Sequence, residues 1–228
     1  MKKETEKLSA TEKVMLKTDS WIQKNAKKLI IAAIAIVVVV VVVAVSSLLV
    51  TKSTNDKFAT LYTLEEHYNT LRAADKSAEG YADKVNTFVA EADLVSGKNK
   101  IDSFAGAKAS LLKANVLFDE GKYQEAYDLY IAIANANSKE YFAPLCYMNA
   151  AAAAENMGNA DDALELYTKV WDVYGKDAPE APKALLGQAR IIEANGDVEL
   201  ASSIYNQLAD EFPSSYYAAL AEAKLLVL

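Results

Sequence analysis

Few side chains in this 228-residue sequence could do chemistry. His67 is the one histidine, and it follows Glu65-Glu66 in a helical pattern, where a solvated or interfacial imidazole is expected before a catalytic or pH-sensing one. Cys146 is the one cysteine, so the chain has no internal disulfide. Because Cys146 lies in an apolar helical pattern, we expect a small buried side chain and not a reactive thiol.

Acidic residues and glycines offer no better catalytic site. Asp161-Asp162 lies in the first turn of an expected helix, where carboxylates complement the helix dipole, so it is not interpreted as a general acid and base pair. No glycine loop of the phosphate-binding type is present, and a single histidine leaves no metal cage. We therefore expect no catalytic residue, no metal and no cofactor, and look for a binding function.

The longest apolar stretch runs from Leu29 to Thr51 and has no charged residue. As a helix, its 23 residues would span about 34 Å, enough to cross a hydrocarbon core of about 30 Å. The seven valines Val37 to Val43 would weaken a helix in water, but in lipid the backbone must satisfy its own hydrogen bonds. We expect a transmembrane helix over residues 29–51.

A cleaved signal peptide is the alternative interpretation of this stretch. Ala44-Val45-Ser46 is an acceptable small-x-small cleavage site. Against cleavage, the segment before the apolar run would be 28 residues long, and the run continues past the site through Val50. A retained membrane anchor is therefore the favoured prediction.

Charge is distributed unevenly on the two sides of the apolar stretch. Residues 1–28 carry eight lysines against four acids and are +4, so the net charge of −7 leaves −11 for residues 52–228. Four lysines lie close before the stretch and only Lys52 and Lys57 close after it, so the positive-inside rule favours a cytoplasmic arm over residues 1–28 and an exported domain. Trp21 fits an anchor at the inner interface, and residues 1–20 read as a mobile arm. An acidic exported domain argues against nucleic acid as a partner.

A pattern repeats three times after residue 101. It is centred on Gly121, Gly158 and Gly196, with periods of 37 and 38 residues. Each glycine would end one helix, and Asn159 and Asp197 would cap the next. Such spacing predicts stacked helical hairpins. The shared positions are Ala126, Ala163 and Ala201 five residues on, Tyr130, Tyr167 and Tyr205 nine residues on, and Ile133, Val170 and Leu208 twelve residues on.

Two further segments complete the expected organisation. Residues 53–100 form a degenerate helical hairpin around Gly80, and residues 103–228 hold three repeats followed by a last helix from about Ser215 to Val227 that covers the end of the stack. The thirteen tyrosines could suggest a carbohydrate or aromatic-peptide surface, but their repeat spacing favours packing between helices.

The repeats resemble the tetratricopeptide repeat family, which has small residues at positions 8 and 20, an aromatic residue at 24 and proline near 32. The matching residues are Ala114, Ala126 and Tyr130; Ala151, Ala163 and Tyr167; and Ala189, Ala201, Tyr205 and Pro213. Tryptophan is absent from position 4 of all three units, only the last has its proline, and the period exceeds the usual value of about 34. The resemblance implies an all-α fold in which the transmembrane helix precedes a right-handed α-solenoid.

The layout as a whole is similar to bacterial single-pass inner-membrane tetratricopeptide proteins, which include the ancillary subunit of the Sec translocon. The resemblance implies a periplasmic scaffold that binds translocon subunits, exported clients or envelope proteins and is associated with translocation or periplasmic chaperones. The alternatives are an envelope-assembly accessory protein of the Tol-Pal or outer-membrane assembly type, or a cell-wall-sugar binder. Self-association through the span or the open edge of the solenoid is a further expectation.

In this family, the first helix of each unit lines a concave groove. The resemblance implies a partner-binding groove formed by Lys108, Leu111, Asn115, Phe118, Met148, Asn149, Lys183, Leu186 and Arg190, together with Leu145, Ala152, Glu155 and Glu193, which occupy equivalent groove-facing positions. Some members clamp the carboxylate at a peptide C-terminus with five residues. Asn115, Asn149 and Lys183 occupy three of those places, whereas Leu111 and Gly187 occupy the other two, so ordinary helix-surface polarity stays the alternative.

Overall fold

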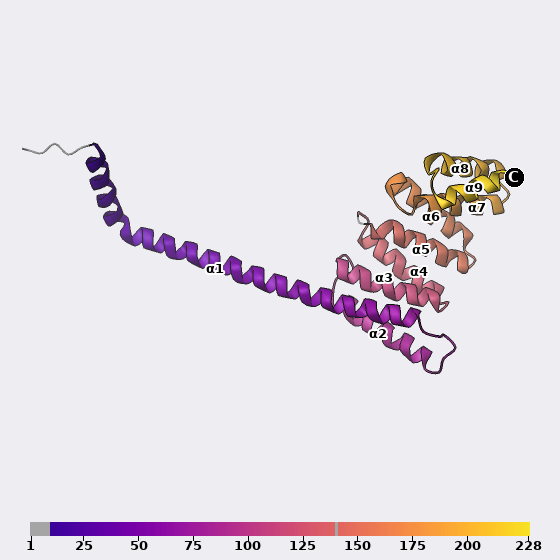
Figure 1. The fold of residues 1–228 in the computed structure, drawn as a ribbon, viewed down its shortest axis with the longest axis horizontal. Coiled ribbons are helices and arrows are strands. Elements are labelled where there is room, and N and C mark those ends of the chain that lie inside the picture. The colour runs from indigo at the N-terminus through magenta and orange to yellow at the C-terminus, as the bar shows by residue number, and fades with distance from the viewer. Residues whose placement is uncertain (1–9, 140) are drawn as a thin grey trace, which may run out of the picture. The chain divides into compact units, whose positions relative to one another are not determined.

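The computed structural model describes residues 10–139 and 141–228, and every regular element in those ranges is helical, which confirms the all-α fold class (Figure 1). The helices are α1 (Ala10–Arg72), α2 (Tyr81–Lys98), α3 (Phe104–Asp119), α4 (Tyr123–Ala136), α5 (Phe142–Asn156), α6 (Ala160–Tyr174), α7 (Ala181–Ala194), α8 (Val198–Glu211) and α9 (Tyr216–Leu225), with a short 3₁₀ turn, η1 (Gly175–Asp177).

Helix α1 begins earlier than expected and runs unbroken into the first hairpin. The mobile arm was predicted over residues 1–20, but the helix already begins at Ala10, because residues 10–20 contain good helix formers and neither glycine nor proline. Residues 1–9 of that arm lie outside the described part. Among the described helices, α1 alone is long and apolar enough to cross a membrane. The chain divides into two compact units, residues 1–56 and 57–228.

The second unit is a stack of helical hairpins, as the repeats predict. The last turns of α1 pair with α2, followed by the pairs α3 and α4, α5 and α6, and α7 and α8, while α9 packs against α7 and α8. Ser215 caps α9 by accepting a hydrogen bond from the Ala218 amide at 3.0 Å. Three apolar clusters run through the stack, and each includes side chains from more than one hairpin.

The turn inside each repeated hairpin has the predicted glycine. Gly121, Gly158 and Gly196 have φ angles of 75°, 82° and 91°, in the left-handed region that favours glycine. Asp197 also caps the next helix as predicted, because its carboxylate accepts from the Leu200 amide at 3.0 Å. Asn159 occupies the equivalent position but makes no side-chain hydrogen bond to its helix.

Small residues allow the helices to approach closely. The alanines at the two crossing positions of each unit, Ala114, Ala126, Ala151, Ala163, Ala189 and Ala201, are fully buried. Gly187 has the same role between hairpins: a Cβ atom added there would lie 2.6 Å from Cε2 of Tyr167. The tyrosine ring therefore fills the place where a side chain of α7 would otherwise stand.

Replacing Gly187 with alanine is expected to destabilise the solenoid by about 1–3 kcal/mol, because the buried Tyr167 ring would have to move to make room for the methyl group. Gly97→Ala is the matched control, since it is also in a helix and a Cβ atom there would meet no atom within 4 Å. Urea unfolding of the detergent-solubilised protein, followed by circular dichroism, measures the difference. Equal midpoints for the two variants would contradict the assigned contact.

Candidate binding groove

The first helices of the four hairpins together line one cavity of about 400 Å³ within the second unit. Side chains from α1, α3, α5 and α7 all reach it, with one tyrosine from α4. The lining residues are Tyr68, Arg72, Asn115, Phe118, Asp119, Tyr130, Asn149, Ala152 and Lys183. Side chains separated by more than a hundred positions in the sequence thus share one surface.

Five of the predicted groove residues meet in this cavity. Asn115 and Phe118 lie on α3, Asn149 and Ala152 on α5, and Lys183 on α7. Three of them, Asn115, Asn149 and Lys183, are the residues that matched the carboxylate-clamp pattern. The stacking therefore brings the three matched positions to one place.

The other predicted residues lie elsewhere. Leu111 and Met148 are buried at 5% and 2% exposure and pack in the apolar core, while Leu186 packs half-buried against the last cluster. Lys108 forms an ion pair with Glu65 at 3.2 Å, and Arg190 binds Glu155 at 2.5 Å. Their polar groups are therefore held by neighbours within the solenoid.

Tyr68 and Arg72 of α1 line the cavity but were missed by the sequence analysis. Gly80 lies eight residues after the end of α1, whereas Gly121 lies only two residues after the end of α3, so aligning the hairpins on their glycines shifts α1 by six residues. Counting back from the helix ends instead pairs Tyr68 with Asn115, and Arg72 with Asp119. Aligning the hairpins on their helix ends, and not on their glycines, would have identified both residues from the sequence.

Hydrogen bonds orient the amide of Asn115, which lines the cavity. Its Oδ1 accepts from the Tyr130 hydroxyl at 2.7 Å, and its Nδ2 donates to the Tyr68 hydroxyl at 3.4 Å. Tyr130 is itself 2% exposed, so its hydroxyl has a fixed position. The side chain of Asn115 is thus oriented before any ligand arrives.

Two cations at the cavity have no acidic partner in the described part of the chain. Arg72 lies over the ring of Tyr68, with its guanidinium carbon 5.7 Å from the ring centre, and Lys183 is exposed. The carboxylate of Asp119 is the one acid in the lining. Cations without ion pairs, beside the oriented amide of Asn115, form an arrangement that can bind an anionic group.

The tyrosines at repeat position 24 pack inside the solenoid, as the repeat spacing favoured. The Tyr167 hydroxyl donates to Glu155 and the Tyr205 hydroxyl to Glu193, each at 2.7 Å. Lys224 also donates to Glu193 at 2.8 Å, so the pKa of that carboxyl is lowered by Lys224 first and by the tyrosine second. These hydroxyls tie the second helix of a hairpin to its first.

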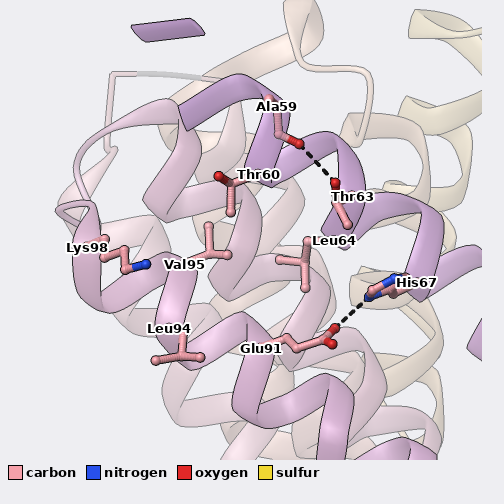
Figure 2. Close-up of a pocket in the computed structure, with 9 residues that line it drawn as sticks. All are labelled: Ala59, Thr60, Thr63, Leu64, His67, Glu91, Leu94, Val95 and Lys98. Atoms are coloured by element: carbon pink, nitrogen blue, oxygen red, sulfur yellow. Dashed lines mark hydrogen bonds and ion pairs between the residues drawn. The ribbon is translucent and has the colours of Figure 1, made fainter. Parts of the chain in front are cut away.

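A second cavity, of about 410 Å³, lies between α1 and α2 (Figure 2). His67 lines it, and its Nδ1 lies 2.7 Å from Oε2 of Glu91 while the imidazole side chain stays half-exposed. Leu94 and Val95 contribute apolar surface. His67 is thus the interfacial residue that the sequence favoured, paired across the first hairpin.

Cys146 is a buried structural residue, as predicted. Burial raises the pKa of its thiol to about 12, and the charge of Glu180 adds to the effect. At neutral pH the sulfur is therefore protonated and a poor nucleophile.

Stacked hairpins whose first helices share one lined face define an α-solenoid. A model of the tetratricopeptide repeat family matches residues 154–224. A TPR repeat-containing protein of Treponema pallidum (strain Nichols) is 29% identical over 165 residues, which cover 70% of this chain and 68% of that protein. The chain therefore contains tetratricopeptide repeats, over residues 154–224 by the family model, and is similar to a repeat-containing relative over a longer stretch.

Solved structures show the same fold. Crystal structures of nearly identical TPR-like repeats, assigned to a kinesin light chain of Podosopora anserina, align with a TM-score of 0.55 for both the parent and a point variant. Each is 16% identical and covers 72% of this chain and 84% of the other. Tetratricopeptide repeats form scaffolds for protein–protein interactions, and proteins of this class are generally not enzymes.

The free energy of unfolding is expected to fall as the pH rises from about 10 to about 12. Burial raises the pKa of Tyr81 to about 12, with Glu120 as the second cause, and burial also raises the pKa of Tyr130, Tyr167 and Tyr205. An unfolded tyrosine loses its proton near pH 10, so above that pH the folded chain holds more protons than the unfolded one and is destabilised as the pH rises further.

Absorbance of tyrosinate and circular dichroism, recorded together across this pH range, test the expectation. Ionisation of the buried tyrosines should coincide with loss of helix, and Tyr81→Phe should weaken the pH dependence. Complete ionisation with unchanged helix content would contradict it.

Proposed function

We propose that this protein is a membrane-tethered scaffold that binds polypeptides in the cavity lined by Tyr68, Arg72, Asn115, Asn149 and Lys183. The observation that carries the proposal is the composition of that cavity. The amide of Asn115 is oriented by the buried Tyr130 and by Tyr68, and the two cations of the cavity have no acidic partner among the described residues. A family of interaction scaffolds supplies the context.

The ligand that fits this lining is a peptide segment with an anionic end. Three of five clamp positions match the family pattern, and Leu111 and Gly187 leave the two others without charge or amide. Arg72 lies on α1 and lines the same cavity. Its guanidinium group is a second cation there, in addition to the ammonium group of Lys183. We infer that this chain binds a C-terminal carboxylate with a different set of residues at the same face.

The apolar stretch of α1 is the proposed tether. Residues 29–51 would hold the solenoid beside the bilayer and raise its effective concentration near membrane-embedded partners. The lysine asymmetry supports a cytoplasmic N-terminus and a periplasmic solenoid.

The biological setting follows from resemblance to inner-membrane tetratricopeptide proteins, which favours translocation or chaperone partners. Crosslinkers attached at the cavity and activated in membranes test this setting. Recovery of translocon subunits or exported clients would support that setting, and recovery of envelope-assembly proteins in their place would support the alternative.

A peptide with a free C-terminus is expected to bind more tightly than its amidated form. Lys183→Ala and Arg72→Ala should each weaken binding of the free form by roughly tenfold, since a charge-assisted hydrogen bond contributes about 1.5–3 kcal/mol. Titration calorimetry on the detergent-solubilised full chain, with a peptide that crosslinking recovers, provides the measurement.

Lys176→Ala is the matched control, because Lys176 is exposed, faces Glu211 at 3.8 Å and lies outside the cavity lining. Its affinity should equal that of the unmodified chain. Equal binding of free and amidated peptides would overturn the carboxylate site.

The full chain is expected to stay with lipid after carbonate extraction, whereas a chain lacking residues 1–52 should be released. The physical reason is that an apolar helix of this length is stable only in the hydrocarbon core. Protease added from the periplasmic side should degrade the solenoid. Release of the full chain by carbonate, or a solenoid protected from that protease, would contradict the tether or its orientation.

A further inference from the structure

Four aromatic rings form a continuous row across three successive hairpins. Phe58 of α1 lies 6.0 Å from Phe104 of α3, measured between ring centres, and Phe104 lies 5.7 Å from Phe142 of α5. Tyr141 stacks on Phe142 at 4.4 Å. These four residues are called the aromatic row below.

Three rings of the aromatic row expose about half of their surface. Phe58 is 50% exposed, Phe104 49% and Tyr141 58%, whereas Phe142 is 3% exposed and anchors the row in the core. Of the four rings, only that of Phe142 is therefore buried in the apolar core. Contiguous exposed aromatic rings are typical of surfaces that bind another protein or a membrane. Aromatic side chains are also enriched where proteins meet the headgroup level of a bilayer.

The row lies along one edge of the solenoid. That edge holds the turns between hairpins, residues 99–103 and 137–141, while the turns inside the hairpins, such as residues 120–122, lie along the opposite edge (Figure 1). Phe104 and Phe142 are the first residues of α3 and α5, which follow directly on the former turns. The two edges can therefore be compared as separate surfaces.

Charge around the aromatic row differs from charge at the opposite edge. Lys98, Lys100 and Lys139 lie at the edge with the aromatic row, are exposed, and form no ion pair within the described residues. Asp102 and, in the sequence, Glu140 are the acids of the same two turns, and the next between-hairpin turn, residues 175–180, holds Lys176 against Asp177 and Glu180. The opposite edge is mainly acidic, with Asp75, Glu79, Asp119, Glu120, Asp161, Asp162, Asp197 and Glu199 against Lys76 and Lys122.

Chain length limits how far the row can lie from the end of the apolar stretch. Phe58 lies seven positions after Thr51, so a chain of any conformation keeps Phe58 within about 25 Å of that end. Lys52 and Lys57 fall in the same short connection. The connection is too short to carry Phe58 far from the surface of a bilayer that holds residues 29–51.

We propose that the aromatic row, with Lys98, Lys100 and Lys139, contacts the headgroup layer of the anionic bilayer in which residues 29–51 are anchored. The rings enter the interface and the lysines face anionic phosphates. The acidic edge would be repelled by the same surface, so the contact selects which edge of the solenoid faces lipid. This inference rests on the tether in the proposed function.

Fluorescent labels at the two ends of α3 test the contact in the full chain. Asp102→Cys places a label beside the aromatic row, and Lys122→Cys places the matched control at the opposite edge; buried Cys146 does not react. Each protein is reconstituted in vesicles of phosphatidylcholine and phosphatidylglycerol that contain a nitroxide-bearing phospholipid. We expect the label at residue 102 to be quenched and the label at residue 122 to stay bright.

Two sets of changes identify the groups responsible. Phe104→Ser with Tyr141→Ser, and separately Lys100→Glu with Lys139→Glu, should each abolish quenching of the label at residue 102. Vesicles of phosphatidylcholine alone should reduce it, because they lack the anionic headgroups. Circular dichroism verifies that each variant is folded, and the surface charge variant keeps the test valid if the aromatic one unfolds.

Flotation after carbonate extraction separates the two possible failures. Protein that floats but shows no quenching at residue 102, or equal quenching at residues 102 and 122, overturns the lipid contact and leaves the tether intact. Protein that fails to float overturns the tether and the contact together.

Discussion

Close approach of helices at fully buried small residues is the constraint on which the rest of the second unit depends. Alanine at both crossing positions of every repeat lets the backbones of paired helices lie near one another, and the tyrosine at position 24 fills the remaining space. Tyr167 against Gly187 shows how strict this fit is, since even one methyl group has no room. Packing of this kind fixes the distance between hairpins, and the distance then fixes which surface residues become neighbours.

The tyrosine hydroxyls extend this constraint to polar groups. Glu155 and Glu193 each accept from a tyrosine of the following helix, so a buried ring holds a surface carboxylate in one place. In the first full repeat, position 12 is Phe118 and cannot accept, and the Tyr130 hydroxyl turns to Asn115 instead. The tyrosine at position 24 therefore stabilises an ion pair in the second and third repeats, whereas in the first repeat it orients an amide of the candidate binding cavity. Because the hydroxyls are engaged and the rings are buried, these tyrosines do not form an aromatic surface for sugars.

The two edges of the solenoid and the face that carries the cavity differ in the side chains they expose, so the three surfaces can bind different partners. An oriented amide and two cations meet in the cavity, exposed aromatic rings and lysines lie at the first two turns between hairpins, and carboxylates lie at the turns within the hairpins. With the proposed tether, such differences would let the solenoid present the cavity while another edge faces lipid. The packing of the interior separates these surfaces. Because the first helix of every hairpin runs in the same direction, equivalent turns fall on the same edge of the stack.

Sequence alone determined the helical repeats, the turn glycines, the buried alanines and the apolar stretch of α1, because each depends on local spacing or on composition. It also identified Asn115, Phe118, Asn149 and Lys183 as facing one groove, since the repeat period places equivalent residues on equivalent helix faces. Only the tertiary structure decided that Tyr68 and Arg72 join them, because a longer turn after α1 breaks the register that a glycine alignment assumes. It also decided that Leu111 and Met148 are buried and that Lys108 and Arg190 are paired with acids. Burial and ion pairing depend on neighbours far away in the chain, and spacing within one repeat carries no information about them.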